Sequence, residues 1–399
     1  MEFDMVDNAA LGTVIKVVGV GGAGGNAVQH MINKGVSGVE FIAANTDAQA
    51  LAVSSANNII QIGDSGLGAG MRPEVGRQLA EQSRSRIEDA LRGAHMVFIA
   101  AGMGGGTGTG AAPIVAEVAK TMGALTVAVV SKPFSYEGQK CMDVAEEGLE
   151  ELTKHVDSLI VILNEKLEDI YEDESMLDWM KHADDVLNNA VAGIAEIINV
   201  PGHINVDFND VKTIMGEQGK AMMGTATAAG VDRARIAAEQ AVASPLLDGI
   251  DLSGAKGVLV NVTASRGLKG KEIKEVMAAV RAFAAPDASI AQGIAYDDAM
   301  GDEIRVTVVA TGLGKNKKSI SLVQPQQQLR TGTYDAPVMQ GAAAVAGGLT
   351  AGKASADALG GMKQPAVWRR EQASEQVQAM QRNGVETYDI PAFLRKQAD

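Results

Sequence analysis

Short apolar runs alternate with polar stretches over the first 170 or so residues of the chain. Each apolar run predicts a buried strand, and the polar stretches between them, such as 74–92 and 139–152, predict helices. This alternation predicts an α/β fold with a doubly wound, Rossmann-like parallel sheet over residues 12–175. The strands are expected at residues 13–18, 39–44, 96–101, 125–130 and 158–163.

A long helix is predicted next, over residues 176–199, and Pro201-Gly202 ends it. Alanines beside its apolar stripe favour burial on more than one side. We therefore expect a central helix, with its connection, over 176–203 between two domains; an ordinary surface helix is the alternative. The stripe consists of Leu187, Val191, Ile194 and Ile198.

A smaller α+β domain is expected over residues 204–315. Strands are predicted at 257–263, 289–296 and 303–310, and helices at 211–218, 231–243 and 271–284.

The composition changes at about residue 316. The segment 324–328 reads QPQQQ, and most residues of 341–363 are alanine or glycine, which bury little surface. These features predict a flexible linker over 316–385, and residues 1–11 are expected to be flexible as well. The chain then ends in an apolar and aromatic cluster. We expect 386–399 to be a peptide that folds onto a partner's groove, the alternative being that it is only the end of the linker.

The sequence GMGGGTGTGAAP at 102–113 stands between a predicted strand and a helix predicted from residue 114, with Pro113 near its first turn. A strand, a glycine loop and a helix in this order direct free backbone N–H groups and a helix N-terminus at an anion. Thr107 and Thr109 add hydroxyls that can bond phosphate oxygens or a metal-bound water. The alternative is a mobile surface loop.

A second glycine loop, GVGGAGGN at 19–26, follows the first strand and precedes a helix predicted at 27–33. It matches GxGxxG, and Asp47 lies near the position of the ribose-binding acid of a dinucleotide fold, so NAD or FAD is one alternative. Two such loops on neighbouring strands favour one polyphosphate held from two sides. A P-loop NTPase is excluded, because the chain contains no GxxxxGK[ST].

Composition excludes several classes of function. The net charge of −14 and an aromatic content of 4% argue against nucleic-acid partners. One cysteine, Cys141, fits a reducing compartment, and there is no apolar run near 18 residues and no basic leader. A cytoplasmic protein without direct membrane insertion is expected. The histidines and Cys141 show no metal-ligand spacing, so no protein metal site is expected.

Asp207 and Asp210 lie three residues apart before a predicted helix. From spacing alone we favour helix capping, with Asp207 as N-cap and Asp210 in the first turn near the positive end of the helix dipole.

Five segments of the chain carry a family resemblance: GVGGAGGNA at 19–27, NTDAQAL at 45–51, GGGTGTG at 104–110, NVDF at 205–208 and DIPAFLRKQAD at 389–399. Together they resemble the FtsZ family of bacterial tubulin homologues. The resemblance implies a tubulin/FtsZ-like fold and a GTPase activated by self-assembly. Such a protein would use Mg²⁺ and form the head-to-tail filaments of the mid-cell division ring.

The resemblance also implies a GTP site. Residues 22–26 and 104–109 would hold the phosphates, Glu137 the ribose and Asp184 the guanine. The family often has an arginine where Cys141 stands, a charge that Lys140 could replace, and an aromatic residue over the base where Met180 stands. The implied GTP-binding residues are Gly21, Gly22, Ala23, Gly24, Gly25, Asn26, Asn45, Ala69, Gly70, Gly104, Gly105, Gly106, Thr107, Gly108, Thr109, Glu137, Cys141, Met180 and Asp184.

Asn205, Asp207 and Asp210 match the family's synergy loop, which enters the site of the next subunit and helps to position the attacking water. This implication replaces the capping interpretation of Asp210. Two other hypotheses stay open here: an NAD(P)-dependent oxidoreductase, and a GTP-binding relative that does not polymerise. The terminal peptide would dock on membrane-anchor and regulatory division proteins, through Asp389, Ile390, Pro391, Phe393 and Leu394.

Overall fold

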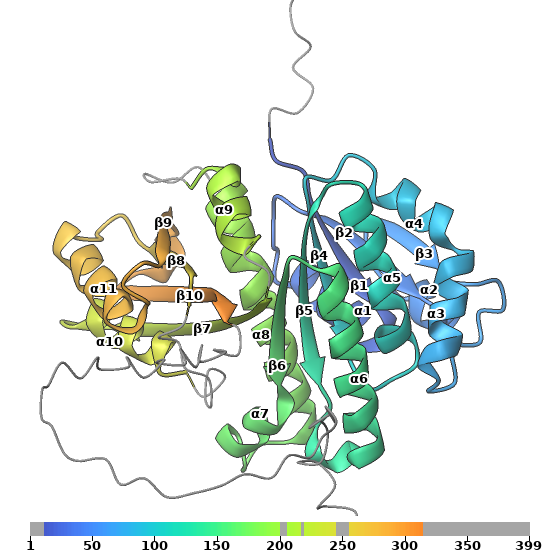
Figure 1. Cartoon of the computed structure of the whole chain (residues 1–399). Helices are drawn as coiled ribbons and strands as arrows, with labels where there is room; N and C mark the ends of the chain where they lie inside the picture. The colour runs from blue at the N-terminus through green and yellow to red at the C-terminus, as the bar shows by residue number, and fades with distance from the viewer. Residues whose placement is uncertain (1–11, 200–205, 217–218, 245–254, 314–399) are drawn as a thin grey trace, which may run out of the picture. The chain divides into compact units, whose positions relative to one another are not determined.

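The computed structural model describes residues 12–199, 206–216, 219–244 and 255–313 (Figure 1). The segments predicted at 1–11, 316–385 and 386–399, together with Asn205, lie outside the described residues. The strands are β1 (Ile15–Val20), β2 (Glu40–Asn45), β3 (Asn58–Gln61), β4 (Met96–Gly102), β5 (Leu125–Lys132), β6 (Ser158–Leu163), β7 (Gly219–Ala229), β8 (Gly257–Ala264), β9 (Ser289–Tyr296) and β10 (Glu303–Leu313).

These strands form a single sheet in the order β3-β2-β1-β4-β5-β6-β7-β10-β8-β9. The first six pair in parallel, as expected for a doubly wound sheet. Side chains alternate between two cores, because successive residues of a strand face opposite sides. Ile15 and Val17 pack on the side of α1 (Gly21–Asn33) and α8 (Met176–Asn199), whereas Val18 and Val20 face the other side. That side is covered by α3 (Pro73–Gln82), α4 (Arg84–Leu91), α5 (Thr107–Thr121) and α6 (Gln139–His155).

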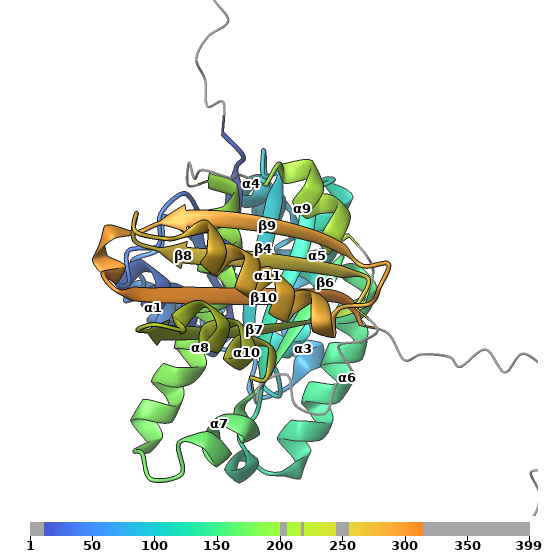
Figure 2. The same cartoon turned by 90° about the vertical axis from the view of Figure 1, so that its left-hand side faces the viewer.

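Strands β7, β10 and β8 are antiparallel, and β9 joins β8 in parallel. One face of these strands is covered by α10 (Arg233–Val242) and α11 (Gly270–Phe283) (Figure 2). The other face contributes Met223, Leu259 and Val309 to the core that contains α8. The predicted helix at 176–199 is therefore confirmed, and it is buried among residues from both halves of the sheet.

The sequence analysis missed β7. Its sequence, GKAMMGTATAA, is rich in alanine and glycine, which have low strand propensity. Nevertheless β7 pairs in parallel with β6 and antiparallel with β10, so it joins the two halves into one sheet. The helix predicted at 211–218 is α9 (Phe208–Met215), which ends three residues earlier.

The helix predicted at 74–92 is two helices, because the chain turns at Ser83 between α3 and α4. The Ser83 hydroxyl is buried and accepts a hydrogen bond of 2.9 Å from the backbone N–H of Gly63. A buried hydroxyl that bonds a distant loop stabilises the break, which the helical pattern could not predict.

Both glycine loops are shorter than predicted. Helix α1 begins at Gly21 rather than at residue 27, and α5 begins at Thr107 rather than at residue 114. Pro113 consequently lies inside α5, not in its first turn. The glycines let helix and strand backbones touch: a Cβ on Gly24 would collide with the Ala100 carbonyl, and one on Gly108 with the Gly102 carbonyl.

Neighbouring glycines of α1 provide a test of this packing. Gly24→Ala should lower the free energy of unfolding by about 1–3 kcal/mol, because the new methyl group has no room against β4. Gly25→Ala is the matched control, since nothing lies within 4 Å of its Cβ position, and it should stabilise the helix by up to ~1 kcal/mol. Urea unfolding of the nucleotide-free protein measures both; equal effects would contradict the packing argument.

Candidate functional site

A cavity of about 670 Å³ lies where β4, β5 and β6 end. Open α/β sheets bind ligands at these carboxyl ends of their strands, because helix N-termini and connecting loops converge there. Of the residues that the sequence predicts for the site, ten line the cavity: Gly22, Ala23, Asn26, Gly105, Gly106, Thr107, Gly108, Glu137, Met180 and Asp184.

The N-termini of α1 and α5 form one side of this cavity. Neither helix has an acidic residue in its first turn or a side chain that caps its N–H groups. Free N–H groups and the positive ends of two helix dipoles make this side suitable for a polyphosphate. The hydroxyls of Thr107 and Thr46 lie 2.6 Å apart and link α5 to the end of β2.

Other predicted residues support the glycine loop without lining the cavity. Gly104 donates its N–H to the Thr109 hydroxyl over 2.9 Å, and its own Cα faces the Cys141 carbonyl and Pro133. Ala69 lies against Gly106. Ala69 and Gly70 both belong to the connection between β3 and α3. The structure thus places these residues behind the loop, where they fix its shape.

Gly21, Gly25 and Asn45 line a smaller cavity of about 100 Å³ beside the first one. Gly22 and Asn26 belong to both cavities. Gly24 is buried against β4 and lines neither.

The opposite side of the main cavity is apolar and carries two carboxylates. It is built by η1 (Ser135–Glu137) and by the first turns of α8. The Phe134 N–H donates to Glu137 over 2.9 Å, which holds that carboxylate at the rim. Burial raises the pKa of Asp184 from 3.8 to about 6; nearby His30 opposes this rise and Asp185 adds to it.

The sequence analysis did not assign several lining residues of this side to the site, among them Asn164, Tyr136 and Phe134. Asn164, which begins α7 (Asn164–Ile170), is buried, and among the described residues its Oδ1 has no hydrogen-bond partner. Tyr136 and Phe134 line the cavity as a stacked pair of rings. The position of Asn164 directly after a predicted strand was the only available hint, because strand ends meet at this edge.

Asp207 and Asp210 lie at the opposite end of the strands from the cavity. Asp207 is the N-cap of α9 and accepts from the Asn209 N–H over 3.0 Å, as its spacing predicted; Asp210 is exposed in the first turn. The ring of Phe208, which is next to Asp207 in the chain, lies 6.2 Å from that of His95, the residue directly before β4. The start of α9 is therefore at the beginning of β4, whereas the cavity lies at the end of that strand. At about 3.3 Å per residue, the length of β4 separates these acids from the cavity of the same subunit by roughly 20 Å.

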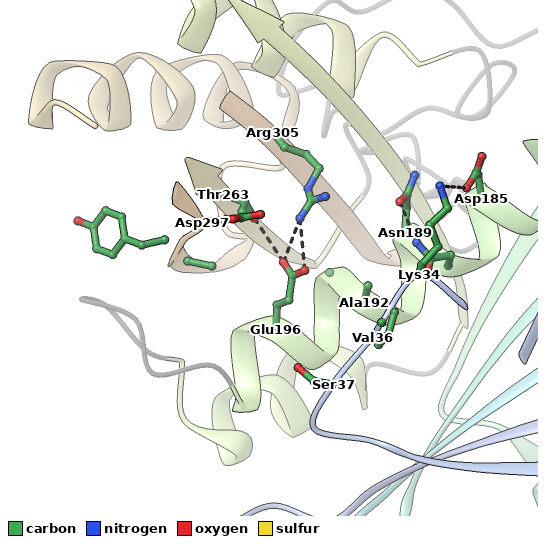
Figure 3. Close-up of a pocket in the computed structure, with 15 residues that line it drawn as sticks. Lys34, Val36, Ser37, Asp185, Asn189, Ala192, Glu196, Thr263, Asp297 and Arg305 are labelled. Atoms are coloured by element: carbon green, nitrogen blue, oxygen red, sulfur yellow. Dashed lines mark hydrogen bonds and ion pairs between the residues drawn. The ribbon is translucent and has the colours of Figure 1, made fainter. Parts of the chain in front are cut away.

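A second cavity of about 480 Å³ lies between the connection after α1, helix α8 and strands β8 to β10 (Figure 3). Its ionic groups are largely paired: Glu196 contacts Arg305 at 3.3 Å, and Asp185 contacts Lys34 at 3.3 Å (Figure 3). It has no glycine loop and no helix N-terminus among its lining residues, so it does not compete as a polyphosphate site.

Comparison with known proteins identifies the family. Residues 14–172 match the model of the Tubulin/FtsZ family, GTPase domain, and residues 219–314 that of the FtsZ family, C-terminal domain. The chain is 50% identical to the cell division protein FtsZ of Pseudomonas putida over the full length of both, and 50% identical to that of Pseudomonas aeruginosa, again over both full lengths. The structure of an empty FtsZ dimer from M. jannaschii is 45% identical, with a TM-score of 0.72 over 75% of this chain and 88% of that one.

The fold, the two helix N-termini at the cavity and these matches define a GTPase of the tubulin/FtsZ class. Within that class the chain belongs to the FtsZ family of cell division proteins. It is a GTP-binding GTPase of the division cytoskeleton, which replaces the NAD(P) alternative. No helix in the described part of the chain is long and apolar enough to span a membrane.

The partly buried Asp184 carboxylate predicts a pH-dependent cost to stability. The folded protein holds this proton more tightly than the unfolded chain, so the cost grows as pH rises from 3.8 to about 6. Asp184→Asn should raise the free energy of unfolding at pH 7 by about 1–2 kcal/mol, less than a full conversion of the pKa shift because the carboxylate is partly solvated. At pH 4 the gain should vanish. Denaturant unfolding at both pH values measures it.

Asp185→Asn is the matched control for this variant. Burial opposes ionisation of Asp185, but hydrogen bonds from His30 and Lys34 together keep its pKa lowered. Removing that charge should therefore destabilise the protein at pH 7. If both variants are equally stabilised, the cost does not come from Asp184.

Proposed function

We propose that the chain binds GTP with Mg²⁺ in the main cavity, assembles head to tail, and hydrolyses GTP only where two subunits meet. The observation that carries this proposal is that the cavity lies at one end of the parallel strands and Asp207 and Asp210 lie at the other end. A subunit whose acids lie at the far end of the strands cannot use them on its own nucleotide. Stacking subunits in one direction brings the acids of one to the cavity of the next, and such a contact does not close on itself.

The parts of GTP are distributed along the cavity. Backbone N–H groups of α1 and α5 bind the phosphates, and Glu137 accepts from the ribose hydroxyls. Asp184 accepts from N1–H and the 2-amino group of guanine, two donors that adenine lacks at those positions. Asn164 also lines this side, and its buried Oδ1 has no hydrogen-bond partner within the described part of the chain.

The cavity is suitable for Mg²⁺ held mainly by the nucleotide. No three His, Cys, Asp or Glu side chains converge as a metal site among the described residues, whereas Thr107 and Asn26, whose side chains carry neutral oxygens, line the cavity. Mg²⁺ favours phosphate oxygens and waters with few protein ligands. When bound, it would neutralise charge on the phosphates.

In this proposal the incoming subunit completes the site. Asp210 and Asp207 accept hydrogen bonds from the attacking water and orient it toward the γ-phosphate, and Asn205 provides an amide beside them. The Asp210 carboxylate has no partner within the described part of its own chain, which leaves it available for this role. Self-assembly would therefore switch on hydrolysis.

Asp210→Ala tests the split site. The variant should bind GTP with unchanged affinity but lose about 10²- to 10³-fold in turnover, because one positioned catalytic group is removed. Wild-type turnover per subunit should be near zero at low protein concentration and rise together with light scattering. Asp232→Ala, an exposed acid before α10, is the matched control and should keep full activity. Turnover that does not depend on protein concentration would exclude the split site.

We also propose that residues 386–399 bind a membrane-anchor or regulatory division protein and bring filaments to mid-cell. In a helix, Ile390, Phe393 and Leu394 fall at positions i, i+3 and i+4 and share one face, and Pro391 suits its first turn. Alone the segment is too short for a stable helix, so it would fold on its partner. Many tails along one filament would bind together with higher avidity than one.

Deleting residues 386–399 should leave GTP turnover and polymerisation of the pure protein unchanged and abolish recruitment to the anchor protein. Co-sedimentation of filaments with anchor-loaded vesicles measures recruitment. A chain whose linker, 316–385, is scrambled at constant composition serves as control and should still be recruited. Loss of polymerisation on deletion would instead place the tail in the filament contact.

A further inference from the structure

Three half-exposed apolar side chains line the main cavity together with Asp184. They are Tyr136, Met176 and Met180, which are 50%, 51% and 43% exposed. Apolar groups are usually buried, so their presence in one cavity with a carboxylate indicates a slot for a flat apolar ligand with polar edges. Tyr136 is the only one of the three with an aromatic face.

Tyr136 is held in place by a row of stacked rings. Its ring lies 5.5 Å from that of Phe134 at an interplanar angle of 15°, and Phe134 lies 6.3 Å from Trp179 at 21°. The Trp179 indole N–H donates to the Tyr171 carbonyl over 2.7 Å, which fixes the row to the chain before α8. Phe134 is only 5% exposed, so Tyr136 is the ring of the row that is open to the cavity.

We propose that Tyr136 stacks on the guanine of GTP and that Trp179, acting through Phe134, positions it. This inference rests on the proposed binding of GTP in the cavity. Met180 and Met176 approach the base from α8, where a thioether offers dispersion but no aromatic surface. Tyr136 thus provides the aromatic contact that the residue at position 180 does not.

The chemistry of the ring suits this role. Burial, and then the carboxylates of Glu137 and Glu168, raise the pKa of the Tyr136 phenol, so the ring is neutral at physiological pH. Glu137, proposed for the ribose, is the next residue in the chain, so sugar and base contacts come from one short element. Base stacking on an aromatic side chain contributes about tenfold to hundredfold in affinity.

The test compares a ligand with a base and one without. GDP and inorganic triphosphate, each with Mg²⁺, are titrated calorimetrically into the full chain. Tyr136→Ala should weaken GDP binding about tenfold or more and leave triphosphate binding within about twofold. Tyr136→Phe keeps the ring and should bind GDP within about twofold of the wild type. Trp179→Ala should weaken GDP binding less than Tyr136→Ala does, and Trp179→Phe should restore it.

Tyr296→Ala serves as the matched control, because that tyrosine is partly exposed at the end of β9 and lines only the second cavity. Unchanged GDP affinity in Tyr136→Ala would overturn the stacking role, as would an equal loss for both ligands, which would assign Tyr136 to the shape of the phosphate loops. A wild-type chain that binds triphosphate and GDP equally would also overturn it. A wild-type chain that binds neither would refute the proposed GTP site itself.

Discussion

Direct contact between helix and strand backbones is the constraint on which the candidate site depends. Gly24 lies against the Ala100 carbonyl, and Gly108 lies against the Gly102 carbonyl, with no side chain between them. This contact lets α1 and α5 begin at the strand ends, so their free N–H groups meet over one cavity. Residues such as Thr109 and Ala69 then fix the loop from behind.

The same cavity contains two environments with opposite electrostatic preferences. One side offers backbone donors and no acid in either first helical turn, which suits phosphate. The other side combines half-exposed methionines and a tyrosine with Asp184, whose burial raises its pKa to about 6. A nucleotide has matching ends, whereas a simple anion would leave the apolar side in contact with water.

Much of the fold could be predicted from the sequence, because apolar runs and helical stripes are local properties. Helix 176–199 and strand 158–163 occupy the predicted residues. The start of α5 could not be predicted, since glycine suits a loop and a close helix contact equally well. Strand β7 was not predicted, because its strand propensity is weak and it forms through its pairing with β6 and β10. Tyr136 could be assigned to the site only from the folded chain, because tertiary contacts bring it there, and the only hint for Asn164 was its position directly after a predicted strand.

Because the cavity and the acids lie at opposite ends of the strands, any head-to-tail filament has two chemically different ends. One terminal subunit presents an open cavity, and the other presents Asp207 and Asp210 to solvent. If hydrolysis needs a junction, a filament always carries one more nucleotide site than it has junctions. The nucleotide at the open end then stays intact until another subunit arrives. The time since a junction formed, and not the age of a subunit, therefore determines when the nucleotide at that junction is hydrolysed.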